Sequence, residues 1–108
     1  MANTFKLATK ASVGVTTVGI YTAPVATTAT IIGITLANVS GTGINVTVGI
    51  ARSVADDISI LKNVPIPQGS TLEVMQGNKI VLEQADAITA KSDVVSSLDC
   101  AITLLEMT

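Results

Sequence analysis

Acidic residues are the first candidates for chemistry in this 108-residue sequence, because it contains no histidine and a single cysteine. Asp56 and Asp57 form the one adjacent acidic pair, and together with Glu83, Asp86 or Asp93 they would offer oxygen ligands to Ca²⁺. A calcium loop spaces several such ligands along one segment, and the D-x-[DN]-x-[DN] spacing is missing. We therefore expect a solvated turn at the acidic pair, and we predict no metal site and no cofactor.

Other catalytic arrangements lack their reactive groups. Zinc sites, Cys–His nucleophile pairs and Ser-His-Asp triads cannot be assembled within one chain that has no histidine and one cysteine. Glycoside hydrolysis needs two carboxylates beside a cleft, and nothing in the sequence places two of them together. Aromatic residues make up only 2% of the chain, so a sugar ring or a base has no platform on which to stack. We predict that the chain is not an enzyme and has no catalytic residues.

Four further features have structural interpretations. Cys100 takes an inward position in an alternating segment and is expected to be a buried free cysteine. The Gly41–Gly43 loop is too short for a phosphate-binding loop, and no helix is expected after it. The glycosylation sequons at Asn38 and Asn45 are interpreted as chance matches, because the sequence shows no signal peptide. Tyr21 is expected to anchor a strand end with its hydroxyl at the surface.

The composition decides the fold class. Val, Ile and Thr together account for 40 of the 108 residues, and β-branched side chains favour strands. A net charge of −2 gives no electrostatic basis for binding nucleic acid. Mean hydropathy is +0.62, but no apolar stretch of about 18 residues suggests a membrane span. We expect an all-β protein made in the cytoplasm, with neither nucleic acid nor membrane as a partner.

Alternation of apolar and polar residues locates the strands. In the segment 44–51 every even position is large and apolar, and the run before it repeats the pattern, so these side chains should enter a core: Ile32, Ile34, Leu36, Ile44, Val46, Val48 and Ile50. The glycines of Ser40–Gly43 predict a hairpin loop between the two runs.

The same pattern continues to the end of the chain. Further strands are expected at 5–9, 15–21, 58–60, 72–74, 79–83, 88–90 and 98–104, with a turn at 76–78. The prolines of Pro65–Gly69 predict a loop that crosses between sheets or an edge. The sequence therefore predicts one domain over 1–108, a single antiparallel β-sandwich (jelly-roll/Ig-like) of about 8–9 short strands. Residues 1–14 are expected to form an extended N-terminal arm or an edge strand.

Charged residues make up only 13% of the chain, about half of what a small soluble domain carries. One interpretation is a Thr-rich surface that is simply soluble. The alternative, which we favour, is that neighbouring subunits cover much of the surface. The contact residues would then include Leu105 and Met107 near the end of the sequence, and Val13 and Val25 in loops.

Four segments carry a resemblance to a known family. Residues 21–24 and 30–38 are similar to the "YTxP…LAN" opening of small β-sandwich virion proteins of tailed bacteriophages, a group common among phages of marine cyanobacteria. Residues 65–74 and 79–83 resemble that group's "PIPxGSxLEV" and "KIVLE" segments. The resemblance covers roughly residues 18–106. One departure is that Gln84 and Ala85 precede Asp86, where the group often has a glycine.

The resemblance implies a non-enzymatic virion structural protein, most specifically a capsid decoration (cement) protein that stabilises the shell. Its implied partners are the major capsid protein or other virion proteins, and its implied state is a homo-oligomer, with a trimer favoured. It would be made in the host cytoplasm, released by lysis and located at the capsid surface. No functional residues come with the family. Two alternatives are a tail, neck or fibre component, and a glycan- or receptor-binding module that uses the loops of Gly41, Asp56 and Gln68.

Overall fold

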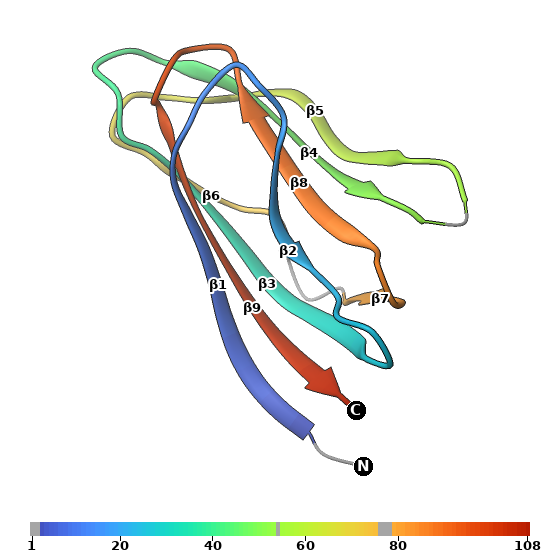
Figure 1. Ribbon diagram of the computed structural model, residues 1–108. Coiled ribbons are helices and arrows are strands. Elements are labelled where there is room, and N and C mark those ends of the chain that lie inside the picture. Colours follow the sequence, from blue (N-terminus) through green and yellow to red (C-terminus); the bar gives the residue numbers. More distant parts are fainter. Residues whose placement is uncertain (1–2, 54, 76–78) are drawn as a thin grey trace.

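The computed structural model describes residues 3–53, 55–75 and 79–108, and within them the chain forms nine strands in two antiparallel sheets (Figure 1). The larger sheet contains β1 (Asn3–Val13), β3 (Thr28–Asn38), β6 (Thr71–Glu73), β7 (Ile80–Leu82) and β9 (Leu98–Met107). The smaller sheet contains β2 (Val18–Thr22), β4 (Ile44–Ala51), β5 (Ile58–Ile66) and β8 (Ala87–Ser92). The predicted all-β sandwich is thereby confirmed. In the described part of the chain there is no helix with the length and apolar character needed to cross a membrane.

The strand order places β9 and β8 at inner positions. The larger sheet runs β1-β9-β3, and β6 and β7 both pair with the far side of β3. β6 lies opposite residues 35–37 and β7 opposite residues 29–31, so together they act as one interrupted edge strand. The smaller sheet runs β2-β8-β4-β5.

The core lies between the two sheets and consists almost entirely of aliphatic side chains. Every second residue of β4 and β9 is buried, which confirms the predicted inward faces: Ile44, Val46, Val48, Ile50, Leu98, Cys100, Ile102 and Leu104. Ile88 and Ala90 of β8 are buried as predicted. Burial of branched aliphatic side chains between two pleated surfaces is the main stabilising contribution, at about 25 cal/mol per Å² of apolar surface.

The prediction for Ile32 is wrong. Ile31 is fully buried instead, and Ile32 is partly exposed. A β-bulge explains the change, because Ile31 lies opposite Leu104 and Gly33 lies opposite Thr103. The extra residue reverses the inward and outward positions, so that Ile34 and Leu36 return to the core as predicted.

The predicted hairpin at Ser40–Gly43 is also wrong, because β3 and β4 belong to different sheets. The loop crosses from one sheet to the other and is held by the buried side chain of Asn38. Its Nδ2 donates hydrogen bonds to the carbonyl oxygens of Thr42 (2.8 Å) and Ile66 (3.0 Å). Alternation identifies the inward face of each strand, but it does not say which strand is its neighbour.

The proline-rich segment was predicted to be an edge or a loop that crosses between the sheets, and it contains both. β5 is an edge strand of the smaller sheet, where Pro65 lies opposite Asn45, and the chain then crosses to β6 in the larger sheet. β5 is longer than residues 58–60 because an edge strand tolerates a proline. The strands expected at 5–9 and 15–21 correspond to β1 and β2 with shifted bounds. The turn predicted at 76–78 lies outside the described residues.

Candidate functional site

The acidic residues do not converge on one site. Three of them each accept a hydrogen bond from a backbone amide at 2.9 Å: Asp57 from Arg52, Asp93 from Asn45 and Asp99 from Ser12. Among residues 3–53, 55–75 and 79–108, no three acidic or cysteine side chains lie close enough together to hold a metal ion. The described carboxylates therefore support loops and strand ends rather than a shared site.

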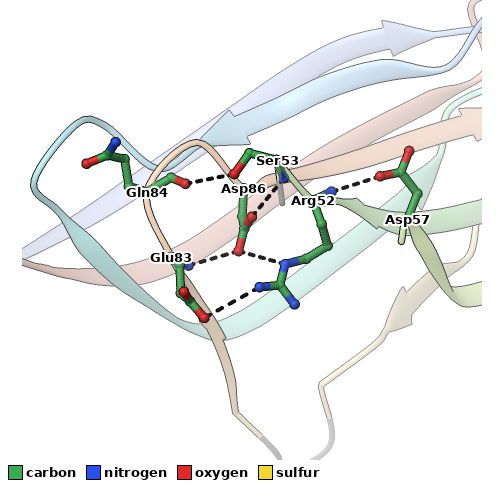
Figure 2. A network of polar contacts seen from close by, with 6 residues as sticks. All are labelled: Arg52, Ser53, Asp57, Glu83, Gln84 and Asp86. Carbon is green, nitrogen blue, oxygen red and sulfur yellow. Dashed lines mark hydrogen bonds and ion pairs between the residues drawn. The ribbon is translucent and has the colours of Figure 1, made fainter. Parts of the chain in front are cut away.

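Asp86 is the centre of a polar network that joins the connection between β4 and β5 to the connection between β7 and β8 (Figure 2). Its buried carboxylate accepts hydrogen bonds from the backbone amides of Glu83 (3.0 Å) and Ser53 (3.3 Å). It also pairs with the Arg52 guanidinium, with Nε and Oδ2 3.0 Å apart. Arg52 reaches the exposed carboxylate of Glu83 at 3.4 Å, and Ser53 donates to the carbonyl oxygen of Gln84. The network ties the end of β4 to the turn before β8.

The electrostatics of Asp86 follow from these contacts. Burial by itself would raise the pKa of its carboxyl group. The amides of Glu83 and Ser53 and the guanidinium of Arg52 together outweigh burial and hold the pKa below its usual value. Asp86 is therefore a stable anion whose hydrogen-bonding capacity is taken up by the fold, which is unsuited to proton transfer near neutral pH.

Tyr21 does not place its hydroxyl at the surface as predicted. The hydroxyl donates a 2.6 Å hydrogen bond to Glu106, which is buried on β9 of the opposite sheet. Lys6 of β1 pairs with the other oxygen of Glu106 at 3.0 Å. The hydrogen bond from Tyr21 and the contact with Lys6 lower the pKa of Glu106. This contact joins the two sheets, and no sequence signal linked Tyr21 to a residue so distant in the chain.

Cys100 is a free, buried cysteine, as predicted. Desolvation, with a smaller contribution from the negative charge of Asp99, raises the pKa of the Cys100 thiol to about 12. The thiolate is the reactive form of cysteine, so this side chain is chemically inert in the folded protein.

A hollow of about 330 Å³ lies on the outer face of the smaller sheet. Gly49 contributes to it by having no side chain, since a Cβ at this position would lie 2.6 Å from the carbonyl oxygen of Ile58. The lining is polar and basic: Thr17, Thr47, Gly49, Ile58, Ser59, Lys62, Asn63, Thr89 and Lys91. It offers hydroxyl and ammonium groups for hydrogen bonds, but no carboxylate or thiol that would act as base or nucleophile.

The loops named for glycan recognition do not form one site. The loop of Gly41 and the turn of Gln68 lie near the Ile44–Ile66 pair at one end of β4 and β5. Asp56 lies in the connection between β4 and β5, beyond the Ile50–Ile58 pair at the other end of these strands. Six residues of strand separate the two ends, a distance of roughly 20 Å.

An apolar area covers part of the outer face of the larger sheet. Cross-strand pairing gives one continuous row, because Phe5 lies opposite Leu105, Leu105 opposite Thr30, and Thr30 opposite Val81. Phe5 is 74% exposed and Val81 is 59% exposed. Together with neighbouring rows they form what we call the outer apolar face: Phe5, Leu7, Ile32, Val81, Leu105 and Met107. No charged side chain belongs to this set.

Two of the four predicted contact residues, Leu105 and Met107, are partly exposed on this face. Val25 is exposed in the loop between β2 and β3. The prediction for Val13 is wrong, because it is only 2% exposed. β1 turns inward at Ser12, whose φ is +58°, and the pairing with β9 shifts register before Val13. This turn inserts Val13 into the core.

Comparison with known proteins shows a shared fold. No protein-family model matches the chain, and no curated protein matches its sequence. A solved structure of Bacillus endospore appendages, described as a family of disulfide-linked pili, is similar with a TM-score of 0.59 and 14% identity. The match covers 99% of this chain and 87% of that chain.

Two viral particles contain similar chains. In the capsid of Helicobacter pylori bacteriophage KHP30, the match has a TM-score of 0.59 and 8% identity, and covers 99% of this chain and 89% of that chain. In the T13 particle of IBDV, the match has a TM-score of 0.60 and 10% identity. It covers 96% of this chain but 30% of that chain. The fold of this chain is therefore one that occurs in viral capsid and pilus proteins.

Proposed function

We propose that the chain is a non-enzymatic structural protein of a virion, and specifically a capsid decoration (cement) protein of a tailed phage. In this role it binds the outside of the shell through contacts with the major capsid protein. It acts as a homo-oligomer, for which a trimer matches the threefold positions of an icosahedral shell. It is made in the host cytoplasm and reaches the capsid surface during assembly.

The outer apolar face carries this proposal. Contiguous exposed apolar surface without charges is typical of an interaction site. Phe5, Leu7 and Val81 are each more than half exposed, so covering them removes apolar surface from water at about 25 cal/mol per Å². A modest contact repeated over a shell stabilises it through multivalency. The structural neighbours in capsids and pili support the choice of an assembly over a catalyst.

The test is binding of the purified protein to expanded capsids of a tailed phage that encodes it. We expect co-sedimentation with the capsids and an increase in their melting temperature. The variant Val81→Glu places a charge on the outer apolar face and should weaken binding at least about tenfold, because a desolvated carboxylate is unfavourable in an apolar contact. Val39→Glu is the matched control, since Val39 is similarly exposed (53% against 59%) but lies in the loop between β3 and β4.

Copy number separates the shell from other virion locations. Hundreds of copies per virion support the decoration role, whereas six or twelve copies indicate a tail or neck component. Absence of the protein from purified virions, or equal loss of binding in both valine variants, would contradict the proposal.

A further inference from the structure

β1 has an open edge. It pairs with β9 on one side, and none of the strands in the described part of the chain lies beyond it on the other (Figure 1). Its two faces are largely exposed as well, with Phe5 and Leu7 on the outer side and Lys6 and Lys10 on the inner side. The strand therefore presents unpaired backbone N–H and C=O groups along one side, which is a template for a further strand.

The other sheet edges in the described residues are short or interrupted. β5 contains Pro65, a residue with positive φ (Asn63, +53°) and two register shifts. β2 has five residues with a register shift between Gly19 and Tyr21, and β6 and β7 have three residues each. Each of these features limits strand addition. β1 has its positive φ and its register shift only beyond Lys10, so its regular part from Asn3 to Lys10 is the long edge that remains.

We infer that β1 pairs antiparallel with β1 of a second copy, around a twofold axis at Leu7, so that the two larger sheets become one continuous sheet. The inference extends the proposed structural role by naming one contact between copies. A twofold contact at this edge covers Leu7, at the border of the outer apolar face, and leaves the rest of that face open, so it is compatible with threefold contacts elsewhere.

The positions of the two lysines favour the Leu7 register, because in it neither lysine lies opposite another charge. An axis perpendicular to the sheet keeps the outer faces on the same side, so an outward residue must lie opposite an outward residue. With the axis at Leu7, residues 3–11 pair along their whole length. Lys6 then lies opposite Ala8 of the second copy, and Lys10 lies opposite Thr4. Leu7 lies opposite Leu7 of the second copy, which places two apolar side chains in direct contact.

The other registers are less favourable. An axis at Lys6 would place Lys6 opposite itself, and an axis at Ala8 would place Lys6 opposite Lys10, and directly opposed like charges destabilise a strand pair. An axis at Phe5 or Thr9 would leave about four residues of the segment 3–11 unpaired, since each shift of the axis by two residues removes pairs from one end. The lysine positions and the length of the paired segment together select one pairing.

The strength of the contact depends on copy number. Antiparallel strands form roughly one hydrogen bond per residue pair, so residues 3–11 would contribute about nine. Such an edge contact is at the small end of interfaces, and it gains strength when many copies are held side by side. The charge of Lys6 is already compensated within its own chain by Glu106.

Disulfide trapping tests the register directly. Directly opposite residues have Cα atoms about 4.5–5.5 Å apart, which suits a disulfide, whereas Phe5 and its copy would be about 14 Å apart in this register. With copper–phenanthroline as oxidant, full-length Leu7→Cys should form covalent dimers at least about tenfold faster than Phe5→Cys. The two sites are matched in strand, face and exposure (67% and 74%), and the native Cys100 is buried and should not react.

Two variants that introduce opposite charges at position 7 provide the second test. Leu7→Lys and Leu7→Glu should each be monomeric by native mass spectrometry, because each opposes like charges at the axis, and an equimolar mixture should form the heterodimer. Equal trapping of the two cysteine variants, no trapping of either, or no heterodimer would overturn the inference. These assays use the isolated chain, so their failure and failure of capsid binding are distinguishable.

Discussion

At the scale of single residues, Asp86 shows how a buried charge contributes to the fold without chemistry. Its carboxylate joins Arg52 and Ser53 to Glu83, which is 31 positions from Arg52 along the chain. Removing one partner of a buried ion pair destabilises a protein strongly, because the other charge loses its compensation. The network is therefore a support for two connections rather than an acid–base site.

Asp86→Asn should lower the free energy of unfolding by about 2–3 kcal/mol at pH 7, as it removes a charge that accepts hydrogen bonds and pairs with Arg52. Because folding lowers the pKa of Asp86, its charge stabilises the fold fully above the unfolded pKa of about 3.9, and this contribution is lost as the pH falls through the folded pKa. Urea unfolding as a function of pH should therefore show that the two proteins become more similar below about pH 4.

The control for this prediction is Asp56→Asn, because Asp56 is exposed in the connection between β4 and β5. It should change stability by less than about 0.5 kcal/mol, as is usual for exposed sites. A stability difference between Asp86→Asn and the native protein that grows with falling pH would contradict the proposed role of the charge.

At the scale of elements, Gly49 determines how closely β4 and β5 approach. It lies in a strand pair with two register shifts, and an added Cβ would meet the carbonyl oxygen of Ile58 at 2.6 Å. A backbone atom on a neighbouring strand cannot rotate away as a flexible side chain can. The glycine is therefore required by contact and not by its φ angle.

Gly49→Ala should destabilise the protein by about 2 kcal/mol or more, because β5 must move to accept the methyl group. Gly33→Ala is the matched control, since Gly33 is also a strand glycine and an added Cβ there meets no atom within 4 Å. We expect that variant to be neutral within about 0.5 kcal/mol, or slightly stabilised. Thermal unfolding of both variants measures the two effects on stability. Equal destabilisation would contradict the prediction that the contact with Ile58 is what requires glycine at position 49.

At the scale of the whole molecule, the distribution of charge separates the two outer faces. The smaller sheet carries Lys62 and Lys91 around its hollow, whereas the outer side of the larger sheet carries the acidic Glu73 and Asp99 beside the outer apolar face. An assembly contact through the apolar face depends on removal of apolar surface from water, and a contact through the hollow would depend on charge.

Binding to capsids should therefore change by less than about twofold between 50 and 500 mM NaCl, since salt screens charges but does not weaken apolar contacts. Co-sedimentation at both salt concentrations measures this. A steep loss of binding at high salt would instead assign the contact to the basic face, and it would contradict the use of the outer apolar face.

Much of the fold could be predicted from local patterns. Even-numbered positions of 44–50 and 98–104 face inward in any antiparallel sandwich, because the period of two is a property of the extended backbone itself. The candidate surface was only partly predictable. Leu105 and Met107 were identified by alternation, but Phe5, Leu7 and Val81 join them only through strand pairing, and Val13 was misplaced because nothing in the sequence predicts the positive φ of Ser12.

The sequence alone determined the fold class, the inward face of most strands and the scarcity of catalytic groups, because these depend on residue types and on spacing within single strands. The tertiary structure decided which strands pair, where the bulge exchanges Ile32 for Ile31, and which polar residues meet, as Tyr21 and Glu106 do across the sandwich. These contacts join residues that are far apart in the chain. Their energies depend on the neighbours that each residue meets, which a local pattern does not contain.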